Sequence, residues 1–199
     1  IPSFILVWMG MEDIYNYART GGAEGGDSIT STAVFNVKFT NLLNELGSLN
    51  AGGALINIPE PSYIPYFNEI PFNGLVLSAA EADSLNILYA GVDSTISFMA
   101  GNNPYVIADA ESPTGRRQMK QGEFILQNVS RDSINCQGWG RTIPIPERYT
   151  LDEDEVEDII TAISAYNSTI ALNATLHEMA LVDMNAFYKT LHESVLFNN

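Results

Sequence analysis

The sequence predicts an α/β domain built on a parallel sheet, and three observations lead to this prediction. Short apolar runs occur at Phe4–Trp8, Ala54–Ile58 and Met179–Val182, without the polar alternation of a half-exposed strand. Such runs are typical of parallel strands buried on both faces. Segments with helical spacing separate the runs, as right-handed strand–helix–strand units require. The length of 199 residues favours one domain, 1–199.

Composition and charge exclude several kinds of partner. The net charge of −15, from 24 acidic against 9 basic residues, would repel nucleic acid and anionic membrane surfaces. No apolar run approaches the roughly 18 residues of a transmembrane helix. No signal peptide is expected either, because Ile1 belongs to or just precedes a core strand, although a targeting segment could have been removed.

Single residue types add two further points. Cys136 is the only cysteine, which excludes an internal disulfide and a multi-cysteine metal site. Asn-x-Ser/Thr sequons begin at Asn128, Asn167 and Asn173, and they matter only in a eukaryotic secretory setting.

Three helices are expected around the strands, and the first two are expected to pack on the sheet. The first begins at a cap between Ser28 and Ser31 and runs to about Leu46. Its apolar stripe is Phe35, Phe39, Leu42, Leu43 and Leu46. Asp152 and Glu155 form the capping box of the second helix. Its stripe is Val156, Ile159, Ile160, Ile163, Tyr166, Ile170 and Ala174. The third helix extends from Asn185 to about Leu196.

Residues 59–146 are expected to be an inserted subdomain that covers one end of the sheet, because the stretch is too long for a simple connection. A capping box at Ser78 predicts a helix that ends near Ala90. Thr95–Met99 and Tyr105–Ala108 are expected to pair as a hairpin. The apolar run from Phe124 to Val129 fits either a helix or a strand.

Acidic residues follow the first predicted strand. Gly10 breaks the apolar run, and Glu12 and Asp13 come directly after it. In open α/β sheets, ligands and catalytic groups lie at this carboxyl end of the strands. Asp183 follows the third strand, so all three acids are expected along one edge. The alternative is that Glu12 and Asp13 are acids at the start of a short helix.

The next segment is rich in glycine and ends in a serine motif. Residues 20–26 lack the Gly-Lys-Ser/Thr of a phosphate-binding loop, so we expect a mobile loop at the mouth of the sheet. Gly26-Asp27-Ser28-Ile29 resembles the nucleophile signature Gly-Asp-Ser-Leu. A nucleophilic serine normally occupies a tight turn straight after a buried strand. We therefore interpret Asp27 and Ser28 as helix-capping residues. Asp83-Ser84-Leu85 is a weaker match, because it lies inside a predicted helix.

The other candidate residues favour structural roles. His177 and His192 are the only histidines, and neither has a second ligand at metal-binding spacing. We expect both to be structural and no metal to be bound. Arg116 and Arg117 would suit a carboxylate ligand, but solvated surface arginine is the favoured interpretation.

The segment around the first predicted strand resembles a known family. FILVWMGMEDIYNYARTGG is similar to the segment around the third block, Gly-x-Asn-Asp, of SGNH (GDSL-type) esterases, most of all a Bacteroidetes group of lipase/acylhydrolase-like proteins. The likeness continues in order through ALINIPEPSYIPYF, LNILYAGV, NPYVIADAESPTGRRQ, DSINCQGWGRTIPIPERYTLD and ALVDMNAF. The resemblance implies a three-layer SGNH-like fold, incomplete here, with no cofactor, and an exported protein, periplasmic or outer-membrane-associated.

The resemblance also implies site residues. Gly10, Glu12 and Asp13 fall on the Gly, Asn and Asp of the third block, where the family builds its oxyanion hole. Glu12 departs from the pattern, because a carboxylate cannot donate the hydrogen bond that an asparagine amide donates. The family's serine and Asp-x-x-His blocks are not found in this chain. The resemblance thus implies part of an esterase or lipase for a small ester or lipid substrate, completed by the rest of its domain or by a partner chain. The alternative is a non-catalytic binding or surface protein.

Overall fold

The computed structural model describes residues 2–194, and its contacts divide the chain into two compact units. One unit, here called the sheet unit, comprises residues 2–19, 26–65 and 157–194. The other, here called the hairpin unit, comprises residues 20–25 and 66–156. The sequence predicted one domain with an insertion over 59–146, so the insertion and the hairpin unit overlap but do not share their bounds.

The sheet unit contains the predicted parallel sheet. Strands β1 (Phe4–Val7), β2 (Gly52–Ile56) and β9 (Ala180–Val182) lie in the order β1-β2-β9, and both pairings are parallel. Leu6 aligns with Ala54, and Ala54 in turn with Ala180. The mixed α/β class and the three parallel strands are therefore confirmed, within one or two residues of the predicted bounds.

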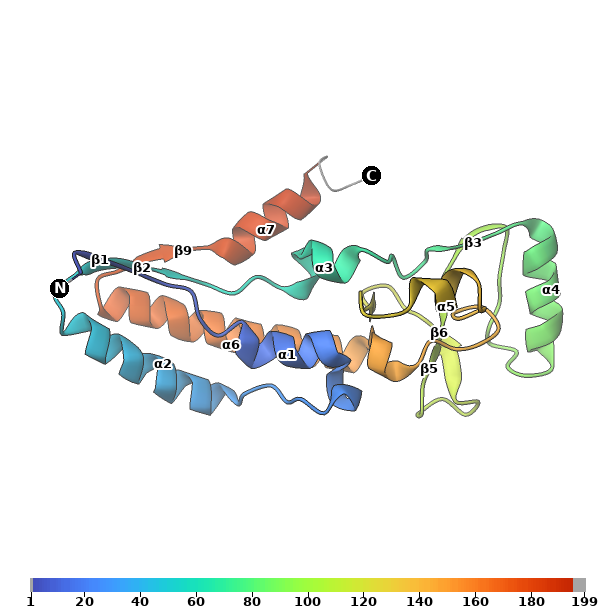
Figure 1. The fold of residues 1–199 in the computed structure, drawn as a ribbon, viewed down its shortest axis with the longest axis horizontal. Helices are drawn as coiled ribbons and strands as arrows, with labels where there is room; N and C mark the ends of the chain where they lie inside the picture. Colours follow the sequence, from blue (N-terminus) through green and yellow to red (C-terminus); the bar gives the residue numbers. More distant parts are fainter. Residues whose placement is uncertain (1, 195–199) are drawn as a thin grey trace. The chain divides into compact units, whose positions relative to one another are not determined.

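The helices of this unit follow their sequence signals. They are α1 (Glu12–Thr20), α2 (Thr32–Gly47), most of α6 (Glu153–Leu176) and α7 (Met184–Glu193), with the short turn η2 (Pro61–Tyr63) after β2 (Figure 1). The next turn, α3 (Pro65–Asn68), begins at the last residue of this segment and otherwise belongs to the hairpin unit. The side chain of Ser31 caps α2. Asp152 and Glu155 form the predicted capping box, with backbone-to-carboxylate distances of 2.9 and 3.1 Å. The predicted end of the last helix at Leu196 lies outside the described residues.

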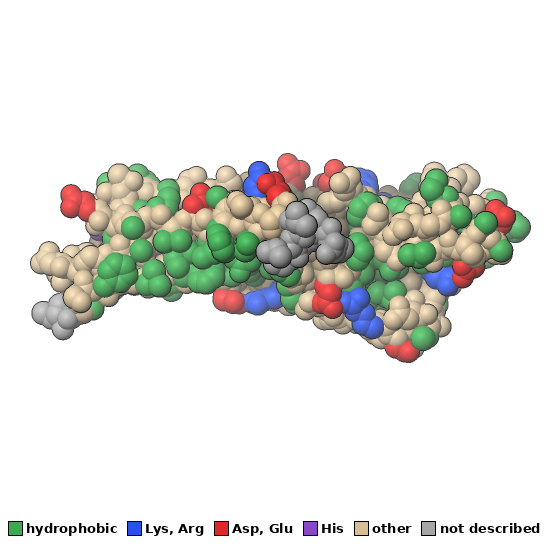
Figure 2. Space-filling view, turned by 90° about the horizontal axis from the view of Figure 1, so that it is seen from above, with side chains coloured by type: hydrophobic (Ala, Val, Ile, Leu, Met, Phe, Trp, Pro, Cys, Tyr) green, Lys and Arg blue, Asp and Glu red, His purple; other side chains and the backbone are tan. Residues whose placement is uncertain are grey.

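The expectation that the strands are buried on both faces is wrong for β1 and for β9, all three residues of which are exposed. Phe4, Leu6 and Trp8 point to one face and are 63%, 61% and 43% exposed, whereas Val7 on the other face is buried. Helices α1, α2 and α6 run along one side of the sheet in Figure 1, and α7 lies on the opposite side. Because α7 buries none of its side chains, the second face is left largely uncovered by residues 2–194. Figure 2 shows hydrophobic side chains gathered along this part of the molecule.

The hairpin unit has its own core and three two-stranded sheets. Strands β3 (Leu75–Leu77) and β4 (Gly101–Asn103), β5 (Val106–Ala108) and β6 (Arg116–Gln118), and β7 (Phe124–Ile125) and β8 (Thr150–Leu151) pair antiparallel. The remaining elements are η1 (Gly22–Gly25), α4 (Ala79–Ala90), α5 (Arg131–Asn135) and η3 (Glu147–Tyr149). The largest core side chains include Tyr89, Ile107, Ile125 and Ile145.

Two local predictions for this unit have opposite outcomes. The capping box at Ser78 and Glu81 is present and starts α4. The predicted hairpin is wrong, because residues 101–103 form a strand with residues 75–77 instead of a turn. Asn103 stabilises this arrangement: its buried amide accepts the Met99 N–H at 2.8 Å and donates to the Met99 carbonyl at 2.8 Å. A side chain therefore takes over bonds that a hairpin partner would have made.

The glycine-rich segment is seated on the hairpin unit, contrary to the expectation of a mobile loop. Gly21 has φ of +98°, and a Cβ there would lie 2.2 Å from the Arg148 carbonyl oxygen. The Ala23 N–H donates to Glu155 Oε1 at 2.8 Å. Gly21 thus allows the segment to approach the backbone at Arg148 closely, and the Glu155 carboxylate holds the middle of the segment at Ala23.

Glu155 makes the stability of this attachment of the glycine-rich segment depend on pH. Burial raises the pKa of the Glu155 carboxyl; bonds from the Ala23 and Asp152 N–H groups lower it, and the charges of Asp152 and Glu147 raise it further. A raised pKa in the folded state means that this group's contribution to stability is complete below about pH 4.3 and is lost as the pH rises through the folded-state pKa.

We expect the Glu155→Gln variant to lack that loss. The unfolding free energy of the natural protein minus that of the variant should decrease as the pH rises from about 4 to 7, measured by urea unfolding. The exposed Glu157→Gln is the control, and its profile should run parallel to that of the natural protein. A parallel profile for Glu155→Gln as well would contradict the assignment.

Candidate functional site

The candidate site lies where the chain leaves β1 and enters α1. Gly10 makes this turn with φ of +98°, and a Cβ there would lie 2.7 Å from Phe35 Cε2 and 3.0 Å from Ile58 Cδ1. Only glycine fits both the backbone conformation and the contact with α2. The packing of the turn therefore accounts for Gly10, whether or not its backbone also binds a ligand.

Glu12 is the first residue of α1 and faces solvent. Its side chain is 69% exposed and its carboxylate forms an ion pair with Arg19, with 2.5 Å between Oε2 and Nη2. Arg19 is held in turn by the Asn16 side chain at 3.0 Å and the Tyr15 carbonyl at 3.2 Å. Glu12 is thus an acid at the start of a short helix, as the alternative interpretation expected. The charge of Arg19 compensates its own.

Two hollows open at this end of the sheet, and they divide the predicted residues. A hollow of about 150 Å³, here called the Gly10 hollow, is lined by Met9, Gly10, Asp13, Phe35, Lys38, Phe39 and Leu42. A second, of about 280 Å³, is lined by Glu12, Asp13, Asn16, Asp27, Ser28 and Thr30. Asp13 borders both, whereas Gly10 and Glu12 each border one. The structure therefore separates two residues that the resemblance places together.

Ser28 lies in the second hollow and not at a helix cap. The cap of α2 is Ser31, whose hydroxyl accepts the Val34 N–H at 3.4 Å, so the capping interpretation of Asp27 and Ser28 is wrong. No imidazole lines the hollow among the described residues. Ser28 therefore has acidic neighbours but no base of the kind that activates a serine.

The histidines lie elsewhere in the sheet unit. His177 follows α6 and contacts Gly47 at the end of α2, near the amino end of β9. His192 is in the last turn of α7, with its ring 5.9 Å from that of Tyr63. These positions are compatible with the structural roles that the sequence predicted.

A rigid base supports both hollows. Tyr166 on α6 stacks on Phe35 with ring centroids 3.7 Å apart, and its hydroxyl donates to the Thr30 carbonyl at 2.5 Å. Burial, followed by the charge of Asp13, raises the pKa of Tyr166 to about 12. Tyr166 therefore stays neutral and keeps donating this hydrogen bond at physiological pH. Tyr15 similarly donates to the Pro59 carbonyl.

Asp183 is tied to the carboxyl edge through a buried amide that sequence reasoning missed. Its Oδ1 accepts the Ala186 N–H at 3.0 Å, as the cap of α7, and Asn57 Nδ2 at 2.8 Å. Asn57 Oδ1 accepts the Asn185 N–H at 2.9 Å. The only signal for Asn57 was that it is the single polar residue within the apolar run Ala54–Ile58. Asp183 thus has a structural role.

Two of the three sequons are also structural. Asn167 pairs with the Ile58 backbone through both its oxygen and its nitrogen, each at 2.8 Å. Asn173 is 1% exposed and donates to Thr40 Oγ1 at 3.2 Å. Neither side chain is free for glycosylation in the folded protein, whereas Asn128 is exposed.

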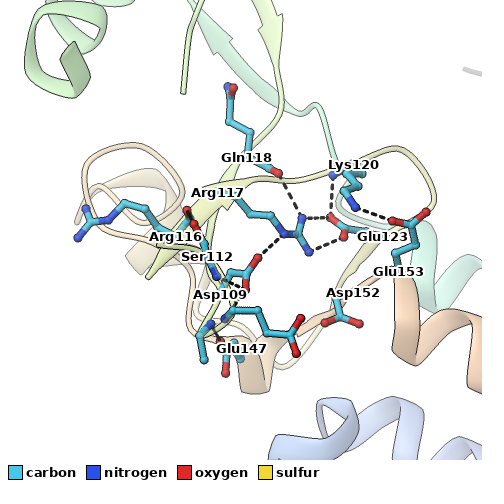
Figure 3. A network of polar contacts seen from close by, with 12 residues as sticks. Asp109, Ser112, Arg116, Arg117, Gln118, Lys120, Glu123, Glu147, Asp152 and Glu153 are labelled. Atoms are coloured by element: carbon cyan, nitrogen blue, oxygen red, sulfur yellow. Dashed lines mark hydrogen bonds and ion pairs between the residues drawn. The ribbon is translucent and has the colours of Figure 1, made fainter. Parts of the chain in front are cut away.

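Arg117 is the centre of an ion-pair network in the hairpin unit (Figure 3). Its guanidinium contacts Asp109 at 2.7 Å and both oxygens of Glu123 at 2.8 and 2.6 Å. The Glu123 side chain is only 1% exposed. Interpreting Arg117 as a solvated surface residue is therefore wrong: it binds carboxylates of its own chain.

The network shifts the pKa values of its members in the directions that these contacts require. The hydrogen bonds that Arg117 donates to the Glu123 carboxylate are the main cause that raises the pKa of Arg117. Burial alone would raise the pKa of Asp109, but bonds from Arg117 and from the Glu111 and Ser112 N–H groups lower it overall. Arg116 points away from the network in Figure 3. We assign the network to stability, because its charges satisfy one another.

In residues 2–194 no group of three or more His, Cys, Asp or Glu side chains is arranged to hold a metal ion. No helix in the same part of the chain is long and apolar enough to cross a bilayer. No family model, curated protein or solved structure matches the chain.

Proposed function

We propose that the sheet unit is part of an SGNH-type ester hydrolase domain whose nucleophile and base are supplied from outside these 199 residues. The single observation that supports this most is the uncovered apolar face of the parallel sheet. Parallel sheets are covered on both faces in folded proteins. Phe4, Leu6 and Trp8 therefore mark a surface that further chain must cover.

The edge of the sheet supports the same proposal. β1 is an edge strand, and within residues 2–194 it pairs only with β2. Its outer backbone groups are free to pair with another parallel strand, as an edge strand's are. A strand beside β1 would end next to Gly10, because parallel strands share their carboxyl edge. A serine at the end of that strand would be close to the candidate site.

The proposed reaction is acyl transfer. The serine hydroxyl attacks the ester carbonyl while a base takes its proton, the alcohol leaves with a proton, and water then hydrolyses the acyl-enzyme. In this scheme the Gly10 turn faces the developing oxyanion. Glu12 brings no donor, but its pairing with Arg19 and its place in the other hollow weaken its repulsion of that charge.

The alternative is a binding or surface protein that kept the fold and lost the reaction. The observation that favours it is the carboxylate at position 12, where the family has an amide donor. Losing one oxyanion donor typically costs about 10²–10³ in kcat.

Assays with p-nitrophenyl butyrate test the proposal. We expect the 199-residue chain to hydrolyse the ester only at the background rate, because Ser28 has no base in its hollow. The Ser28→Ala variant should be indistinguishable from it. Activity of this chain that is lost in Ser28→Ala would overturn both the proposal and the assignment of Ser28.

The full-length protein of this proposal, here called the parent protein, distinguishes the hydrolase from the non-catalytic alternative. We expect its gene to encode a Gly-Asp-Ser block before Ile1 and an Asp-x-x-His block after Asn199, and the protein with both to hydrolyse the ester. Glu12→Asn in that protein should change the rate less than tenfold, because the Glu12 carboxylate lies outside the Gly10 hollow. Absence of both blocks, or an inactive parent protein, would leave the non-catalytic function.

A further inference from the structure

We propose that the Gly10 hollow binds the acyl chain of a short ester, up to about six carbons long, and prefers the neutral ester to the carboxylate product. The inference rests on the proposed function, since it names the substrate class of the same site. It starts from the walls, size and rim of the hollow.

The walls are apolar and held in place. Phe35 and Phe39 are both 5% exposed, and their rings stack with centroids 5.2 Å apart. Phe35 also stacks on the buried Tyr166. Leu42 on α2 and Met9 after β1 complete the lining. A wall built on stacked, buried rings cannot collapse into the space, so the hollow is available to a ligand without rearrangement.

Size limits the ligand. The volume of about 150 Å³ equals that of an engineered apolar cavity that binds benzene, a molecule of six carbons. Each methylene that enters an apolar site strengthens binding about fourfold. Affinity should therefore increase with chain length to about six carbons and then level off, because further carbons stay in water.

The rim decides the charge of the ligand. Lys38 and Asp13 both border the hollow, and neither is in an ion pair within the described part of the chain. One cation and one anion give the rim no net charge, so a neutral ester carbonyl is accepted. A carboxylate is attracted by Lys38 but repelled by Asp13 and by the net charge of −15. The product should therefore bind more weakly than the ester.

Titration with methyl esters from propanoate to octanoate tests this, with the methyl signals of Met9 followed by NMR in the 199-residue chain. We expect affinity to increase about fourfold per methylene up to hexanoate and to level off at octanoate. Sodium hexanoate should bind at least tenfold more weakly than methyl hexanoate. Leu42→Phe fills the hollow and should weaken ester binding at least tenfold. Val37→Phe, at an exposed position of the same helix, should leave it unchanged.

Met9→Phe fills the hollow from its exposed side and serves if Leu42→Phe fails to fold; because it removes the Met9 reporter, its titration is followed by the methyl signals of Leu42. Equal binding in the filled and control variants, affinity still rising at octanoate, or tighter binding of hexanoate would each overturn the inference. Ester hydrolysis by the parent protein without these effects would refute the inference alone. Short-ester binding by an inactive parent protein would refute the hydrolase proposal alone.

Discussion

Replacing Arg117 by methionine is expected to destabilise the hairpin unit by about 3–5 kcal/mol, the usual cost of removing one partner from a buried ion pair. The reason is Glu123, whose side chain is 1% exposed and would keep only the Lys120 N–H, at 2.7 Å. The matched control is Arg131→Met. Arg131 pairs with Glu69 at 2.6 Å, but both side chains are about half exposed, so the loss should stay below about 1 kcal/mol.

Tryptophan fluorescence allows this loss of stability to be measured in the hairpin unit alone. The chain has two tryptophans, and Trp139 packs against the hairpin core whereas Trp8 belongs to the sheet unit. A Trp8→Phe background therefore makes Trp139 the only reporter during urea unfolding. The double variant Arg117→Met, Glu123→Met should recover most of the stability, because the buried Glu123 charge is gone and Asp109 keeps the bonds from the Glu111 and Ser112 N–H groups. A double variant as unstable as the single one would contradict this explanation.

Gly21→Ala is expected to release residues 20–25 from the hairpin unit. The alanine Cβ would lie 2.2 Å from the Arg148 carbonyl oxygen, which is backbone and cannot rotate away. Strain from φ of +98° adds about 1–3 kcal/mol. Together these should increase hydrogen exchange at the Ala23 amide about 10²-fold, since that amide is protected by its bond to Glu155.

Gly122→Ala is the matched control for this variant. Gly122 has φ of +97° in the same unit, but no atom lies within 4 Å of the position of its Cβ. It therefore carries the same backbone strain without the collision, and protection at Ala23 should be unchanged. Unchanged protection in Gly21→Ala would show that the segment is not held by this close approach.

The sequence predicted what depends on local pattern. The parallel strands follow from their apolar runs, and α2, α4 and α6 follow from helical spacing and capping residues. Uncovered Phe4 and Leu6 were not foreseen, because an apolar run shows that a strand can be buried on both faces, not that this chain covers it. The hairpin prediction failed because the partner of residues 101–103 lies at 75–77, and no local signal contains that pairing.

The candidate site was predicted in part for the same reason. The carboxyl edge of β1 could be located, since topology places functional groups there. Sequence order could not show that Gly10 and Glu12 border different hollows, or that Ser28 shares one with Glu12. Arg117 was misjudged because its carboxylate partners at 109 and 123 are brought to it only by β5, β6 and the turn after them.

The split of the sheet unit along the chain has a consequence for its synthesis. Strands β1 and β2 are complete by Ile56, but the part of α6 that packs against Phe35, and strand β9, come after residue 156. At 5–20 residues per second, a ribosome needs roughly 5–20 s for the intervening hundred residues. During that time the nascent chain holds β1 and β2 without α6 and β9, while residues 66–156 can already fold. Chaperone capture is therefore most valuable in this interval.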